Sequence, residues 1–77
     1  MTLDQLQPGQ TARIAAVQGP GSFRRRLLEL GLVEGAPITR QGSAPLGDPL
    51  TFRIRGAILA LRRTDAAAVA LDDGAAA

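Results

Sequence analysis

The run of three arginines at positions 24–26 is the stretch of this chain best suited to binding chemistry. Guanidinium groups hold carboxylates and phosphates through paired hydrogen bonds, so the run could contact an acidic protein or a nucleic acid. Successive helix residues point about 100° apart, and Arg24, Arg25 and Arg26 would therefore spread over about 200° instead of forming one stripe. Charge runs are usually solvated faces. The pattern therefore favours a solvated or structural role for these arginines, and contact with an acidic partner is the alternative.

The same arginines are not explained by the stability of a helix. Cations in the first helical turn oppose the helix dipole by a few tenths of a kcal/mol each. We expect Arg26 to lay its aliphatic stem along the apolar side of the helix and Arg25 to reach Glu29 one turn later.

Side chains that hold metals or perform catalysis are scarce. The chain has no His and no Cys, and its seven carboxylates are scattered without the spacing of a metal site. It also lacks Lys and Tyr, which leaves only Ser, Thr, Asp, Glu and Arg for acid, base or nucleophile roles. We therefore expect no direct metal binding, no cofactor and no enzymatic activity.

Nucleic-acid binding is disfavoured but testable. Four further basic residues could join the triplet in one surface: Arg53, Arg55, Arg62 and Arg63. The chain has two Phe and no Tyr or Trp, and both Phe occupy inward positions of the expected elements, which leaves no platform for stacking bases. Residues 19–22, Gly-Pro-Gly-Ser, could cradle an anion before a helix, but a turn with a capping residue is the favoured interpretation.

One short helix must carry the triplet. Ser22 is a suitable N-cap and Gly31 is placed where a helix needs a left-handed residue to end. Phe23, Leu27 and Leu30 fall within about 60° of one another and form an apolar stripe. We expect a helix of about nine residues that packs on a sheet, with Leu32 folding back on Leu27.

The rest of the chain alternates short apolar runs with turn residues. We expect strands at 11–17, 36–41, 50–55, 58–61 and 69–71, with Ala12, Ile14 and Ala16 on the inner side of the first. Turns or single helical turns are expected at 2–6 (capped by Thr2), at Gly56-Ala57 and at 64–67 (capped by Thr64), and a loop at 42–49. Five strands with a helix between the first two predict a mainly β fold, a small barrel that leaves no sheet edge exposed.

The totals are consistent with one small domain. A chain of 77 residues, 45% hydrophobic and without cysteine, fits a folded domain of a reducing compartment. No apolar run approaches the ~18 residues of a membrane span and no signal sequence is evident, so we expect a soluble, cytoplasmic protein. The expected domain covers residues 1–72, and 73–77 are expected to form a flexible tail.

Two sequence motifs carry a resemblance to a known family. Residues 26–32 read RLLELGL and are followed by Glu34-Gly35, while residues 44–49 read APLGDP. Arg55-Gly56, residues 59–63 and Asp65-Ala66 follow in the same order and at similar spacing. From about Leu3 to Leu71, the chain resembles the FeoA family of ferrous iron transport accessory proteins.

The resemblance implies an SH3-like β-barrel in the bacterial cytosol that works with FeoB, a membrane permease with a GTP-binding domain. With few coordinating side chains, we expect the chain to dock on the cytosolic region of that permease to modulate transport or assembly. The expected partner-binding residues are Arg24, Arg25, Pro45, Leu46 and Pro49, although the loop prolines fit turn chemistry equally well. A small-barrel nucleic-acid binder, a regulatory module like the C-terminal domain of iron-dependent repressors, and weak self-association remain alternatives.

Overall fold

A computed structural model of the chain describes residues 1–72, and the expected tail at 73–77 lies outside the described residues. The elements, in chain order, are the 3-10 turn η1 (Leu3–Gln5), β1 (Thr11–Val17), α1 (Gly21–Glu29), β2 (Pro37–Ser43), β3 (Leu50–Ile54), β4 (Ala57–Leu61), α2 (Arg63–Ala66) and β5 (Val69–Asp72). The mainly β prediction, with five strands and a helix between the first two, is confirmed. Within residues 1–72, no helix is long and apolar enough to cross a bilayer.

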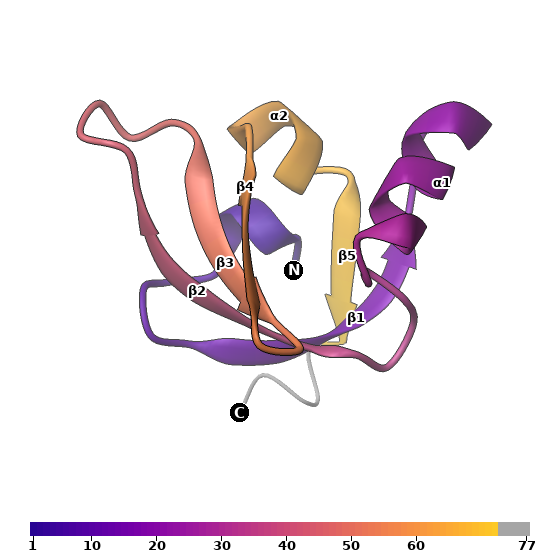
Figure 1. Ribbon diagram of the computed structural model, residues 1–77, viewed down its shortest axis with the longest axis horizontal. Helices are drawn as coiled ribbons and strands as arrows, with labels where there is room; N and C mark the ends of the chain where they lie inside the picture. The colour runs from indigo at the N-terminus through magenta and orange to yellow at the C-terminus, as the bar shows by residue number, and fades with distance from the viewer. Residues whose placement is uncertain (73–77) are drawn as a thin grey trace.

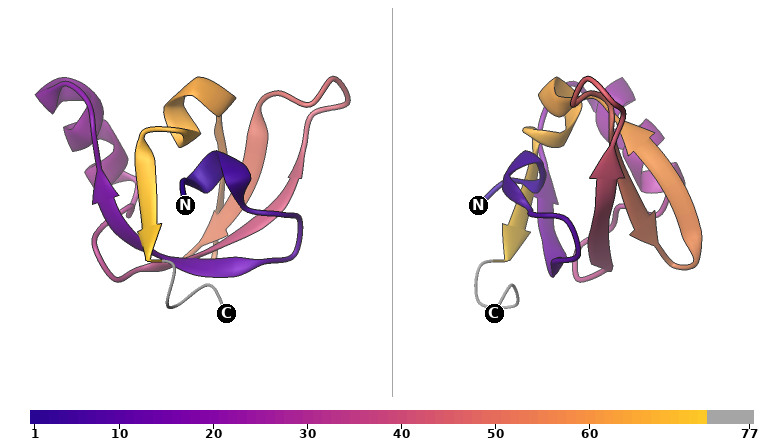
Figure 2. Two further views of the ribbon diagram at one scale, coloured as in Figure 1. Left: turned by 180° about the vertical axis from the view of Figure 1, so that it is seen from behind. Right: turned by 90° about the vertical axis from the view of Figure 1, so that its left-hand side faces the viewer.

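The five strands form one antiparallel sheet in the order β4-β3-β2-β1-β5. Figures 1 and 2 show the sheet curling around η1, with α2 across one opening and α1 at one end of the molecule. The outer edge of β5 is partly covered by the N-terminus, through a bridge between Thr2 and Ala70 and a hydrogen bond from Leu71 N to Met1 O of 2.8 Å. In the described part of the chain, β4 has no strand beyond it, so the expectation that every edge is removed was wrong at β4.

The core lies inside the curled sheet. Its largest fully buried side chains come from nearly every element: Leu3, Leu6, Ile14, Leu27, Leu32, Ile38, Leu50, Phe52, Ile54 and Val69. The clean alternation of β3 places Leu50, Phe52 and Ile54 inward, as predicted. The alternation of β1 fails at its end, because the pairing with β5 shifts register between Ile14 and Ala16, and Ala16 is exposed instead of inward.

The turns differ in detail from the prediction. The β3–β4 hairpin turns on Arg55 and Gly56, whose φ values are 50° and 81°, and not on Gly56-Ala57. Positive φ at both central residues matches the twist of the flanking strands. β2 extends to Ser43, with a register shift between Arg40 and Gly42, so the loop begins at position 44 and not at 42.

Helix α1 has the predicted length and end, but a different start. Pro20 is its N-cap, without a side-chain hydrogen bond, and Ser22 lies inside the helix. Gly31 adopts a φ of 100°, and the hydrogen bond from Leu32 N to Leu27 O (3.0 Å) brings the chain back as expected. Leu27 is fully buried, whereas Leu30 is 48% exposed and does not join the core. Thr64 likewise lies inside α2, whose N-cap is Arg62.

Candidate partner-binding surface

Arg24 and Arg25 lie on the first turns of α1, and both side chains are exposed. In the described residues, neither guanidinium has a hydrogen bond or an ion pair, and the expected Arg25–Glu29 pair does not form. Arg26 behaves as expected, because its guanidinium carbon lies 5.8 Å from the centre of the Phe23 ring. Two neighbouring cations of the triplet are therefore left without an intramolecular partner.

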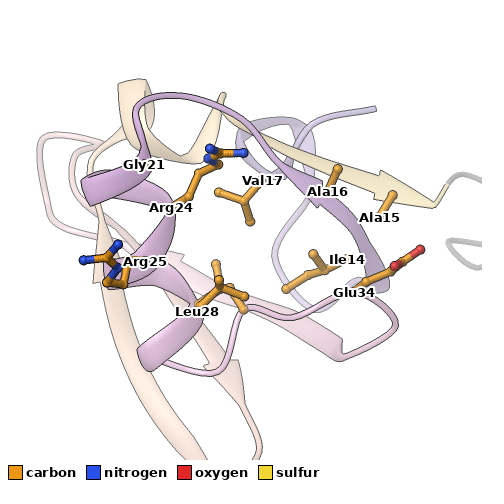
Figure 3. Close-up of a pocket in the computed structure, with 10 residues that line it drawn as sticks. Ile14, Ala15, Ala16, Val17, Gly21, Arg24, Arg25, Leu28 and Glu34 are labelled. Atoms are coloured by element: carbon orange, nitrogen blue, oxygen red, sulfur yellow. The ribbon is translucent and has the colours of Figure 1, made fainter.

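A groove of about 510 Å³ separates α1 from β1. Figure 3 shows the side chains of Leu28, Val17 and Ile14 between the helix and the strand, with Arg24 and Arg25 on the helix and Glu34 at the far end. We call this hollow the α1–β1 groove; it is lined by Ile14, Ala15, Ala16, Val17, Gly21, Arg24, Arg25, Leu28, Leu32 and Glu34. Its floor is aliphatic and its polar side chains lie at the rim.

Sequence reasoning did not find this groove. Leu28 is 51% exposed and, as the residue after Leu27, lies about 100° around the helix from that buried position. The other wall depends on the register shift in β1 that turns Ala16 outward. Leu28, an apolar residue outside the predicted stripe, could have indicated an exposed apolar site on the helix. The register shift could not have been predicted, because neighbouring alanines in β1 give no alternation of apolar and polar residues to reveal it.

The second set of candidate residues lies in the loop between β2 and β3. Pro45, Leu46 and Pro49 are all exposed, and Leu46 is 97% exposed. The loop is nevertheless well held: Ala44 N donates to Pro49 O (2.9 Å) and Gly47 N to Ala44 O (2.8 Å). Arg63 of α2 fixes its tip, with Nε donating to Gly47 O (2.8 Å) and its backbone N to Asp48 Oδ1 (3.0 Å).

The two sets of candidate residues do not form one surface. Figure 1 places α1 at one end of the longest axis and the β2–β3 loop at the other, and the reverse view in Figure 2 agrees. The molecule extends 30 Å along that axis. The structure therefore groups Arg24 and Arg25 with the α1–β1 groove and separates both from Pro45, Leu46 and Pro49.

The remaining arginines do not add an aromatic-lined basic surface to the described part of the chain. Phe52 is fully buried, and the half-buried Phe23 ring is covered by Arg26. With the Gln41 amide turned so that its oxygen faces Arg53, that oxygen accepts from Arg53 Nε (3.2 Å) and Nη2 (3.0 Å). Arg62 Nε lies 3.7 Å from Asp65 Oδ2. Residues 1–72 also contain no group of three or more His, Cys, Asp or Glu side chains arranged to hold a metal ion.

Similar proteins give an independent indication of identity. The family model for the FeoA domain matches residues 1–72. A Fe(2+) transport protein A/Fe(2+) transporter FeoB fusion protein of Porphyromonas gingivalis is 44% identical over 72 residues. The match covers 94% of this chain and 8% of the fusion protein, so the chain spans less than a tenth of that relative.

Solved structures of FeoA proteins are also similar to this chain. FeoA from Chlorobium tepidum is 38% identical with a TM-score of 0.86, over 92% of this chain and 68% of that one. FeoA from Stenotrophomonas maltophilia, solved with zinc and described as a procaryotic SH3 domain protein, is 32% identical with a TM-score of 0.86, over 97% and 93% of the two chains. The fold is therefore SH3-like.

A manganese-dependent transcriptional repressor also superimposes, with a TM-score of 0.84 over 94% of this chain and 35% of the repressor. At 16% identity, this likeness shows a shared fold and nothing about function. The family match and the identities of 32–44% to FeoA proteins decide the assignment: the chain belongs to the FeoA family.

Proposed function

We propose that the chain is an accessory protein of ferrous iron uptake that docks on the cytosolic GTP-binding region of an FeoB-type permease. The observation that supports this most directly is the fusion relative, in which the sequence similar to this chain is joined to FeoB. Joining two modules turns their association into an intramolecular event and raises the effective concentration of each for the other. Such a fusion is useful when the two modules act together.

The chemistry of the described residues is consistent with a binding role without catalysis. The exposed polar groups of the α1–β1 groove are Arg24, Arg25 and Glu34, and no His, Cys or Lys accompanies them. Guanidinium groups are strong hydrogen-bond donors and poor proton acceptors. The chain thus acts by contact with a macromolecule on the cytoplasmic side of the membrane, and ferrous iron is the cargo of the permease.

Two surfaces are available for that contact. One contains Arg24 and Arg25 beside the α1–β1 groove, and the other is the loop with Pro45, Leu46 and Pro49. Because these two surfaces lie at opposite ends of the molecule, a partner that contacts both must extend around the domain.

A titration of the purified chain against the cytosolic region of the cognate permease tests the proposal. We expect saturable binding by isothermal titration calorimetry, and repeats with GDP and with a non-hydrolysable GTP analogue reveal whether the nucleotide state matters. A labelled oligonucleotide in low salt serves as the polyanion control. Absence of binding to the permease region in every nucleotide state would reject the proposed function.

A further inference from the structure

We propose that the α1–β1 groove receives an acidic, amphipathic segment of the protein partner, with aliphatic side chains on the groove floor and carboxylates against Arg24 and Arg25. This inference rests on the proposed function and deepens it, because it chooses one of the two available surfaces and gives the chemistry of the segment that binds there.

The charges of the groove point to a carboxylate-bearing segment. Arg24 and Arg25 have no partner among the described residues, and Arg24, in the first turn of α1, opposes the helix dipole. Neither arginine therefore has a contact that stabilises the helix, unlike Arg26, which packs over Phe23. Carboxylates of a partner can form paired hydrogen bonds with guanidinium groups and complement the positive end of the helix at the same time.

The groove floor points to aliphatic side chains. Leu28 is one of the few large apolar residues that are half exposed or more, and it faces Val17 and Ile14 across the groove. Covering Leu28 and the half-buried Val17 gains about 25 cal/mol for each Å² of apolar surface removed from water, whereas Ile14 is already buried. The exposed leucine and the two free arginines lie side by side, so one amphipathic segment can satisfy both.

The lining argues for a polypeptide over a small metabolite. Pockets for small molecules usually contain a few well-placed polar groups that fix the ligand inside the cavity. Here the three charged side chains of the lining, Arg24, Arg25 and Glu34, are all exposed. Glu34 lies at the opposite end from the arginines, so the groove has a positive and a negative end that orient a bound segment.

A second copy of the chain is a poorer match. The fully exposed Leu46 could enter a neighbour's groove, but the carboxylate beside it, Asp48, already accepts a hydrogen bond from Arg63 N at 3.0 Å. The chain also has a net charge of +2, which adds repulsion between copies.

The test compares matched variants in the calorimetric titration against the permease cytosolic region. We expect Arg24→Glu with Arg25→Glu to weaken binding at least ~10-fold, because both contacts become repulsive. Arg53→Glu with Arg62→Glu changes the net charge equally, away from the groove, and should stay within about 2-fold of wild type. Arg24→Lys with Arg25→Lys keeps the charge and should recover most of the binding.

The apolar contact is tested in the same way. Leu28→Ala should weaken binding about 3- to 10-fold, whereas Ile58→Ala, which removes a 59% exposed aliphatic side chain from β4, should have little effect. Raising the salt concentration should weaken wild-type binding and strengthen binding of the doubly reversed variant, because salt screens the attraction in the first case and the repulsion in the second. Circular dichroism melts check that every variant is folded.

The outcomes separate the two proposals. If the permease region binds wild type and the two groove variants equally well, the groove is not the site and the proposed function stands. A larger loss for Leu46→Ala than for Leu28→Ala would likewise overturn the groove in favour of the loop. If wild type does not bind, both proposals fail, and sedimentation of the chain alone shows whether the groove takes a second copy instead.

Discussion

The nine arginines of the chain differ in what their side chains contact. Several have structural partners: Arg13 donates to Gly35 O (2.8 Å), and Arg63 holds the β2–β3 loop. Arg24 and Arg25 have none in the described part of the chain. Counting basic residues therefore overstates the surface available for binding, and the two unpaired neighbours stand out against that background.

Arg40 was not singled out by the sequence, yet it is the only buried charged residue within positions 1–72. Its side chain is 8% exposed, and it donates through Nη1 to Leu6 O (2.8 Å) and through Nε to Gly42 O (3.3 Å). The bond to Leu6 O joins the end of the N-terminal turn to β2, and the bond to Gly42 O lies within β2. An inward position in a strand suggests an apolar residue, so an arginine satisfied by carbonyl groups cannot be anticipated from alternation alone.

We expect Arg40→Ala to lower the free energy of unfolding by about 2–3 kcal/mol. The change removes hydrogen bonds of a charged donor and leaves the Leu6 carbonyl buried without its partner. Urea denaturation followed by circular dichroism measures the loss. Arg53→Ala, which removes an exposed arginine, is the control and should cost less than about 1 kcal/mol. Equal effects of the two changes would contradict the structural role of Arg40.

At the scale of elements, period-two and helical patterns predicted every strand and the main helix. The predicted ends of these elements were less accurate where the backbone geometry of a turn or a cap determines them. Arg55 occupies a positive-φ turn position that glycine or asparagine would fill more easily, and it therefore moved the hairpin by one residue from the expected Gly56-Ala57. Ser22 and Thr64 are good capping residues by type, but each helix begins one residue before them. Propensity identified the elements, and tertiary packing set their ends.

Gly21, the first residue of α1, and Gly31, just beyond its end, allow a matched test of how the helix ends. Gly31 has a φ of 100°, whereas Gly21 does not adopt a positive φ and has open space around its Cβ position. Gly31→Ala should destabilise the domain by about 1–2 kcal/mol, because an alanine is strained there even though the nearest atom, Arg55 Cδ, is 4.0 Å away. Gly21→Ala should be neutral or stabilise by up to about 1 kcal/mol. Thermal melts of both variants measure the contrast, and a stabilising Gly31→Ala would contradict it.

At the scale of the whole molecule, the sequence predicted the fold but not the arrangement of the candidate residues. The motifs at 26–32 and 44–49 suggest a single surface when read as parts of one family pattern. The curled sheet places them at opposite ends. Helix α1 lies beside β1, whereas the loop at 44–49 projects from the ends of β2 and β3, and only the pairing of the strands determines how far apart these parts lie. The α1–β1 groove was also missed, because it needs residues from a helix, a strand with shifted register and the turn at Glu34.

The small size of the domain makes each buried side chain matter. Leu6 is fully buried and joins the N-terminal segment to the core, while its backbone carbonyl independently accepts from Arg40. Leu6→Ala should therefore create a cavity without disturbing that bond, at a cost of about 2–5 kcal/mol. A domain of this length has roughly 4–12 kcal/mol of stability in total, so a single truncation should remove a large part of it.

Urea denaturation followed by far-ultraviolet circular dichroism suits this measurement, because the chain has no Trp or Tyr to report by fluorescence. Leu46→Ala removes the same atoms from a side chain that is 97% exposed and should change the midpoint very little. A Leu6→Ala variant as stable as Leu46→Ala would mean that the N-terminal segment is not an integral part of the core. The predicted contrast instead makes residues 1–6 as necessary to the SH3-like sheet as its strands.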